Sequence, residues 1–228
     1  ENILLMSGFG GIGKTALARL VFHSVKKNYD QVAWIPYNKN LKESMLSAIL
    51  GLKGTDRETR WFEIHNIMNS DATKLIIIDN VDRDEKNDQY PQNDPLLRKI
   101  SGFNNVTVIL TSRLDKLYSR GSYSCYKVEF LSPDACVELF YKHYANDPDR
   151  AQQDVVKDLV ELAKYHTLTI ELIANAAEKE TNLQAYYNKL KESFANAKLK
   201  VQVGHNEEYA TIVTHLRALF DISNKSDE

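Results

Sequence analysis

The sequence predicts an α/β fold, a parallel sheet with flanking helices, followed by an all-α helical unit. Three observations support this prediction. Short aliphatic or β-branched runs alternate with stretches of helical spacing over residues 1–130. The first of these runs leads into a glycine-rich loop that opens a helix. From Leu131 onward the spacing is helical, without further strand-like runs.

The glycine-rich loop has the sequence Gly8-Phe9-Gly10-Gly11-Ile12-Gly13-Lys14-Thr15. It fits the phosphate-cradling pattern G-x-x-x-x-G-K-[ST], between a buried-strand run and a helical stretch. Glycines let backbone N–H groups approach phosphate oxygens, and the helix adds its positive end. Lys14 would bind the terminal phosphates, and the Thr15 hydroxyl would bind Mg²⁺. A glycine turn that happens to precede a lysine is the alternative. The predicted nucleotide-binding residues here are Gly8, Gly10, Gly11, Ile12, Gly13, Lys14, Thr15 and Ala16.

Further strands are predicted at 31–37, 74–79, 106–113 and 126–130, with helical stretches at 41–50, 61–68 and 96–100. The run that ends in Asp79 reads as a parallel strand buried on both faces. Ligands bind at the carboxyl ends of such strands, so Asp79 is predicted to hold Mg²⁺ opposite Thr15. A helix cap or turn residue is the alternative interpretation.

Arg113 ends the run Val106–Arg113, and a guanidinium at that end of the sheet could bind the γ-phosphate. The alternative is an ordinary surface arginine. The polar, acidic stretch from Arg83 to Pro95 reads as an exposed loop.

Composition restricts the function classes. The 228 residues carry a formal net charge of −2, and basic residues are scattered among acids, so no nucleic-acid surface is expected. No run has the length of a membrane span, and there is no signal-like segment. Cys125 and Cys136 lack metal or disulfide spacing and are predicted to be packed, reduced thiols in a cytoplasmic protein. Because the chain opens directly on a strand, we expect a piece of a longer protein.

Three regions are predicted along the chain. Residues 1–130 form the nucleotide-binding domain. Residues 131–198 form the helical subdomain, which starts with Ser132 as N-cap and Pro133 at the first helical position. Residues 199–228 contain a linker and a last amphipathic helix from Glu207 to Phe220.

Taken in order, these segments resemble the NB-ARC group of STAND nucleotide-gated switches. The resemblance implies a P-loop NTPase sheet, a helical subdomain and the start of a truncated winged helix. It also implies ATP or ADP with Mg²⁺, and places Thr167 and Leu168 at the nucleotide from the helical subdomain. The segments that carry it are the loop from Gly8 to Thr15, Leu75–Asp82, Leu110–Arg113, Leu131–Phe140, His166–Leu172 and His215–Ser223.

Two positions depart from the family pattern. The family often has a second acid after the strand that ends in Asp79, and this acid activates the attacking water. Here that position is Asn80, which cannot act as a base, so slow hydrolysis is expected. Asp82 could substitute as the base. The family's nucleotide-touching proline is replaced by Thr167, while the neighbouring His166 either lines that contact or simply starts a helix.

Three functions follow from this interpretation. The first is a STAND-type switch with slow ATP hydrolysis, in which Lys14, Asp79 and Arg113 act on the phosphates. Its nucleotide state would control opening and self-association, and effector and sensor domains would lie in flanking sequence. The second is a scaffold that keeps ADP without hydrolysing ATP. The third is an AAA-type remodelling ATPase, which would need an intersubunit arginine and a basic pore.

Overall fold

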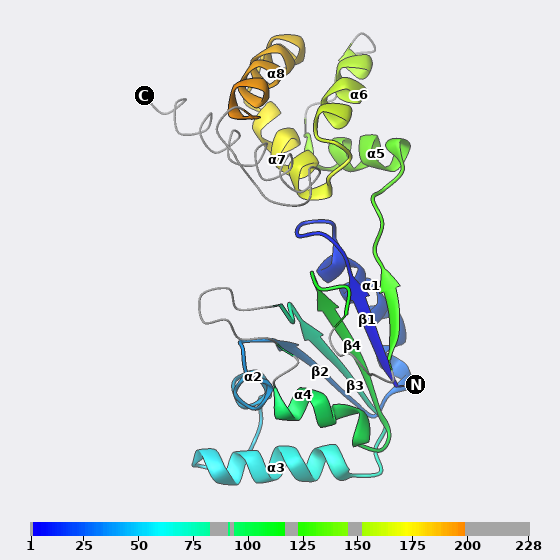
Figure 1. Ribbon diagram of the computed structural model, residues 1–228, viewed down its shortest axis with the longest axis vertical. Coiled ribbons are helices and arrows are strands. Elements are labelled where there is room, and N and C mark those ends of the chain that lie inside the picture. Colours follow the sequence, from blue (N-terminus) through cyan, green and yellow to red (C-terminus); the bar gives the residue numbers. More distant parts are fainter. Residues whose placement is uncertain (1, 83–90, 92–93, 117–122, 146–151, 199–228) are drawn as a thin grey trace. The chain divides into compact units, whose positions relative to one another are not determined.

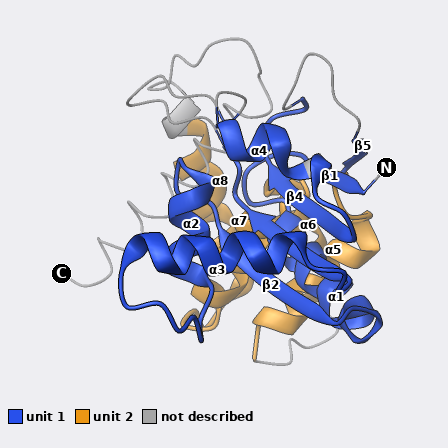
Figure 2. Cartoon of the chain, turned by 90° about the horizontal axis from the view of Figure 1, so that it is seen from below, with its two compact units in different colours: residues 1–128 blue, residues 129–228 orange. Residues whose placement is uncertain are grey.

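The computed structural model describes residues 2–82, 91, 94–116, 123–145 and 152–198. The chain divides into two compact units, residues 1–128 and 129–228, and each is described by itself (Figure 2). The linker and winged-helix start predicted at 199–228 lie outside the described residues. Most of the loop predicted at 83–95 lies outside them too.

The first unit is built on a five-stranded sheet in the order β2-β3-β4-β1-β5 (Figure 1). All its strand pairs are parallel. This confirms the predicted α/β class. The strands are β1 (Ile3–Ser7), β2 (Gln31–Pro36), β3 (Lys74–Asp79), β4 (Val106–Ser112) and β5 (Ser124–Lys127).

Helices cover both faces of this sheet, as Figure 1 shows. Leu75 and Ile77 of β3 pack with α1, whereas Ile76 and Ile78 pack with the helices on the other face. Burial on both faces explains why β3 reads as a continuous apolar run. The helices are α1 (Lys14–Val25), α2 (Leu41–Ala48), α3 (Arg57–Asn69) and α4 (Pro95–Lys99), with short 3₁₀ turns η1 (Lys26–Asn28) and η3 (Ile100–Gly102).

The last strand begins and ends earlier than predicted. The sequence pattern favoured residues 126–130, but pairing with β1 sets Ser124 opposite Leu4 and Lys127 opposite Ser7. All four residues of β5 are exposed at the sheet edge, so apolar alternation says little about this strand. The prediction of two packed thiols was therefore wrong for Cys125, which is exposed, and right for Cys136, which is buried.

Asp94 corrects the prediction of an exposed loop at the end of the 83–95 stretch. It is buried and caps α4, accepting hydrogen bonds from the backbone N–H groups of Leu96 and Leu97. It also accepts from the N–H of Leu41 at 2.6 Å and from the hydroxyl of Tyr37 at 3.2 Å. One carboxylate thus joins the starts of α2 and α4 to the end of β2.

Among the described residues of the second unit, all regular secondary structure is helical. Ser132 caps the first helix by accepting from the N–H of Ala135, and Pro133 is its first residue, as predicted. Across the described ranges, no helix combines the length and apolar character needed to cross a membrane. The helices are α5 (Pro133–His143), α6 (Gln153–Leu162), α7 (Thr167–Ala177) and α8 (Leu183–Lys198).

Candidate phosphate-binding site

The glycine-rich loop joins the carboxyl end of β1 to α1. Gly13 is the N-cap of α1 with φ of 106°, a left-handed conformation that side chains rarely adopt. Gly8 has φ of 148°, and a Cβ there would lie 3.0 Å from the carbonyl oxygen of Val128. Glycine is therefore needed at Gly8 for two reasons, conformation and the close passage of Val128, the last residue of the first unit. The loop places the first turn of α1, which contains Thr15 and Ala16, at the carboxyl end of β1.

Lys14 is folded onto this loop. Its Nζ donates to the carbonyl oxygens of Gly8 at 2.9 Å and Phe9 at 2.7 Å, and the residue is only 9% exposed. Burial lowers the pKa of Lys14 below its ordinary value, although the carboxylates of Asp82 and Asp79 oppose that shift. A desolvated ammonium of this kind is suited to a phosphate, which offers charged oxygens in place of carbonyls.

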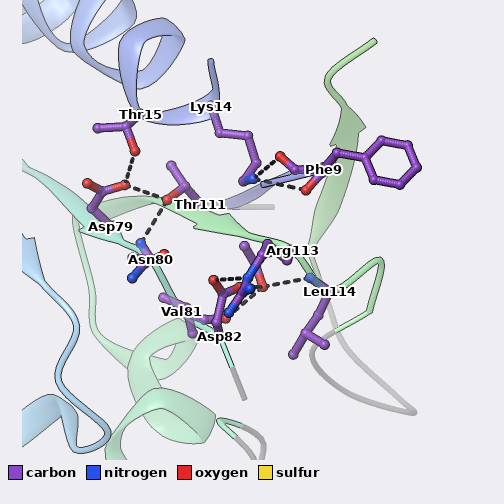
Figure 3. A network of polar contacts seen from close by, with 12 residues as sticks. Phe9, Lys14, Thr15, Asp79, Asn80, Val81, Asp82, Thr111, Arg113 and Leu114 are labelled. Carbon is purple, nitrogen blue, oxygen red and sulfur yellow. Dashed lines mark hydrogen bonds and ion pairs between the residues drawn. The ribbon is translucent and has the colours of Figure 1, made fainter. Parts of the chain in front are cut away.

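Asp79 lies opposite the loop and accepts hydrogen bonds from two hydroxyl groups (Figure 3). Thr15 Oγ1 donates to Asp79 Oδ1 at 2.8 Å, and Thr111 Oγ1 donates to the same oxygen at 2.5 Å. The N–H of Asn80 donates in turn to Thr111 Oγ1 at 2.8 Å. Thr111 was not among the predicted site residues. Its position at a strand end was visible in the sequence, but the pairing that brings it beside Asp79 was not.

Thr15 and Asp79 fit a magnesium ion. Both present oxygen ligands, which Mg²⁺ prefers, and their oxygens are already within hydrogen-bonding distance. Among the described residues no group of three or more His, Cys, Asp or Glu side chains could hold a metal alone. A metal here would therefore complete its shell with water and phosphate oxygens, the usual arrangement for Mg²⁺.

Arg113 lies at the end of β4 and is paired with Asp82. Its backbone N–H donates to Asp82 Oδ1 at 2.6 Å, and its Nε donates to Oδ2 at 2.8 Å. A Cβ added to Gly10 would lie 3.5 Å from Arg113 Cδ, so the stem of the arginine runs beside the glycine-rich loop. The structure thus brings Arg113 to the same loop as Lys14.

The residues predicted from the helical subdomain lie in the second unit. Thr167 and Leu168 form the first turn of α7, and Leu168 is 37% exposed. His166 is fully buried as the N-cap of that helix, and its Nδ1 lies 2.8 Å from Thr169 Oγ1. The Thr169 N–H donates to the same ring nitrogen, so His166 starts the helix, one of the two roles left open by the sequence.

A glycine-rich loop with a buried lysine, facing an acidic strand end on a parallel sheet, defines a P-loop NTPase. A Walker-type ATPase of Pyrococcus abyssi has a similar fold, with a TM-score of 0.56 and 14% identity over 86% of this chain and 68% of that chain. The NB-ARC domain family matches residues 1–150, and the chain belongs to that family. The resemblance seen in the sequence is thereby confirmed.

Two curated relatives come from Arabidopsis thaliana. A probable disease resistance RPP8-like protein is 25% identical over 201 residues, covering 80% of this chain and 21% of the relative. A second probable disease resistance protein is 27% identical over 180 residues, covering 72% of this chain and 19% of the relative. The chain therefore spans about a fifth of the length of these relatives. Family membership makes it the nucleotide-binding part of a signalling switch in the general sense.

Proposed function

We propose that this chain is the ATP- and ADP-binding core of a STAND-type switch, whose nucleotide state controls opening and self-association. The observation that supports it best is the arrangement around Asp79. The hydroxyls of Thr15 and Thr111 converge on that carboxylate from α1 and β4. The desolvated ammonium of Lys14 belongs to the same loop-helix junction. These groups would bind the phosphates of the nucleotide and Mg²⁺.

In this proposal each residue has one role. Lys14 and the loop amides bind the terminal phosphates, while Thr15 and Asp79 hold Mg²⁺, which would neutralise phosphate charge. Arg113 binds the γ-phosphate and so distinguishes ATP from ADP. Thr167 and Leu168 contact the nucleotide from the helical subdomain, as the family resemblance implies.

Slow hydrolysis is part of the proposal. The residue after Asp79 is Asn80. Its backbone has a φ of 67°, and its N–H donates a hydrogen bond to Thr111 Oγ1. An amide side chain cannot take a proton from water, so phosphoryl transfer to water would lack its usual base. The same observation favours the second candidate, a scaffold that retains ADP and does not turn over.

The names of the relatives suggest a biological setting. Both are probable disease resistance proteins, so we propose a role in defence signalling for the longer protein to which this chain corresponds. Its sensor and effector would lie in flanking domains, and a cytoplasmic location remains the expectation from its composition. Self-association through the nucleotide-binding domain would follow exchange of ADP for ATP.

Nucleotide binding to the Lys14→Ala variant tests the proposal. Removing a charged hydrogen-bonding group from a phosphate site should weaken ATP and ADP binding by at least about tenfold. Isothermal titration calorimetry on the 228-residue chain measures both dissociation constants. Lys27→Ala, which removes an exposed lysine after α1, is the matched control. Equal affinity of the wild type and Lys14→Ala would refute the proposal, and measured phosphate release separates the slow ATPase from the scaffold.

A further inference from the structure

Asp82 accepts hydrogen bonds from both the backbone N–H and the Nε–H of Arg113, just beyond the carboxyl ends of β3 and β4. Figure 3 shows Arg113 beside Asp82, and the Ser112 hydroxyl oxygen lies 3.2 Å from Asp82 Oδ1. Ser112 is completely buried, and its single hydroxyl proton is donated to the carbonyl oxygen of Val81 at 2.6 Å. The carboxylate therefore fixes both the backbone and the side chain of Arg113 to the end of β3.

This arrangement does not suit a catalytic base. Each oxygen of the Asp82 carboxylate accepts one hydrogen bond from Arg113, so the carboxylate is held as the anion of an ion pair. Taking a proton from water would neutralise Asp82 and remove the charge that pairs with the Arg113 guanidinium, which opposes its use as a base. Its geometry fits a different role, that of holding the arginine.

Burial indicates that the ion pair persists when a ligand binds. The Asp82 side chain is 9% exposed and that of Arg113 is 46% exposed. Leaving a nearly buried carboxylate without its cation is costly, which opposes any movement of Arg113 away from it. A guanidinium has five N–H donors, so one arginine can serve a carboxylate and a phosphate together.

The pair also acts on the phosphate loop. Arg113 Cδ runs beside Gly10, and the charges of Asp82 and Arg113 shift the pKa of Lys14 in opposite directions. The guanidinium that Asp82 holds is thus electrically coupled to the ammonium that would bind the terminal phosphates. Without Asp82, the Arg113 side chain would sample many rotamers, and its positive charge would no longer be fixed beside the phosphate loop.

We propose that Asp82 is a positioning residue that holds Arg113 beside the phosphate loop and thereby sets the affinity for a nucleoside triphosphate relative to a diphosphate. The inference rests on the proposed nucleotide-binding function and deepens it, because it assigns the triphosphate preference to a pair of residues. Asp82 acts through Arg113 and touches no phosphate itself.

The test compares ATP and ADP dissociation constants, with Mg²⁺ present, for Asp82→Asn, Arg113→Ala and the double variant. Asp82→Asn keeps an oxygen for the backbone N–H of Arg113 but removes the charge that holds its Nε. We expect the ratio of ATP to ADP affinity to fall about tenfold in each single variant. The double variant should fall no further, since both changes remove one interaction. Asp115→Asn, an exposed acid two residues after Arg113, is the matched control and should leave the ratio unchanged.

The possible outcomes distinguish failure of this inference from failure of the proposed nucleotide-binding function. If the wild-type chain binds no nucleotide, the proposed function fails and the inference fails with it. If the wild type binds and Asp82→Asn changes ATP and ADP affinity equally, only the inference is refuted. A rise in the ratio refutes it as well, since Asp82 would then compete with phosphate for Arg113. Arg113→Lys, which keeps the positive charge but removes the Nε–H bound by Asp82, should lower the ratio in the same direction if Asp82→Asn fails to fold by circular dichroism.

Discussion

Single side chains at this site serve two partners each. Thr111 donates to Asp79 and accepts from the N–H of Asn80, so one hydroxyl orients the predicted magnesium ligand and satisfies a backbone donor. Asp82 likewise accepts from both the backbone N–H and the Nε–H of Arg113, and so joins the ends of β3 and β4. Residues of this kind carry a cost when replaced, because removing one group leaves another without its partner.

Thr111→Val tests this shared role. The variant keeps the shape of the side chain but leaves the N–H of Asn80 without its acceptor, so we expect a loss of about 1–3 kcal/mol in the free energy of unfolding. Urea titration followed by circular dichroism measures it. Thr107→Val, on the same strand, is the control and should change stability little. A Thr111→Val variant as stable as the control would show that the hydroxyl does not hold this network.

Asn80→Asp tests the cause proposed for slow hydrolysis. It supplies a carboxylate after Asp79, and Asp tolerates the left-handed conformation found there. General-base catalysis contributes about 10²-fold or more, so phosphate release should rise by at least about tenfold under single-turnover conditions. Asp82→Glu, which keeps the charge at the neighbouring acid, should not produce this rise. An Asn80→Asp variant with unchanged turnover would mean that Asn80 does not limit hydrolysis.

Among the secondary structure elements, the end of α6 is built without glycine. Lys164 and Tyr165 follow this helix with φ of 53° and 58°, both in the left-handed region. The Tyr165 N–H still donates to the carbonyl oxygen of Val160 at 3.3 Å, so the turn closes the helix although neither residue favours its conformation. The next residue is His166, which starts α7, so this turn sets where α7 and Thr167 begin.

Lys164→Gly should therefore stabilise the chain. Glycine adopts a left-handed conformation without a Cβ penalty, but it is also more flexible when unfolded, so the expected net gain is about 0.5–1 kcal/mol. Equilibrium urea unfolding measures it. Lys164→Ala keeps the penalty and serves as the control, which should show no comparable gain. Destabilisation by glycine would mean that the lysine side chain, rather than the backbone, governs this turn.

At the scale of the whole molecule, the described residues of the two units form separate cores. The first unit has an apolar layer on each face of the sheet, and the second has a cluster within its helices. The helical core contains Tyr186, which is 2% exposed, and its hydroxyl has no hydrogen-bond partner among the described residues. Burial, with a smaller effect of Glu180, raises the pKa of Tyr186 well above its ordinary value. The helical unit therefore contains a group that resists ionisation.

This predicts a loss of stability in alkali. In the unfolded chain Tyr186 ionises near its ordinary pKa of about 10, whereas the folded chain keeps it protonated. The stabilisation is complete below about pH 10 and decreases as the pH rises further, because only the unfolded state then releases the proton. Thermal unfolding between pH 9 and 11 measures the decrease. Tyr186→Phe should show a weaker dependence on pH, and an identical dependence in both proteins would refute the assignment.

Much of the fold and part of the site follow from local patterns. Lys14, Thr15 and Asp79 each stand next to a strand or helix that the sequence makes recognisable, and parallel strands end at the same edge of a sheet. Thr111 and the holding role of Asp82 could not be found in this way. They depend on β4 lying beside β3 in one register, which pairs Leu110 with Ile78, and register is a long-range property.

By itself, the sequence determined the α/β fold class, the nucleotide-binding loop and the NB-ARC resemblance. It also determined that Asn80 stands where the family often has an acid. These are properties of residue type and spacing along the chain. The tertiary structure decided that β5 pairs at Ser124–Lys127, that Asp94 is buried, and that Asp82 is bound to Arg113. The physical reason is common to all three. Each depends on hydrogen bonds between segments far apart in the chain, whose partners are chosen only when the sheet assembles.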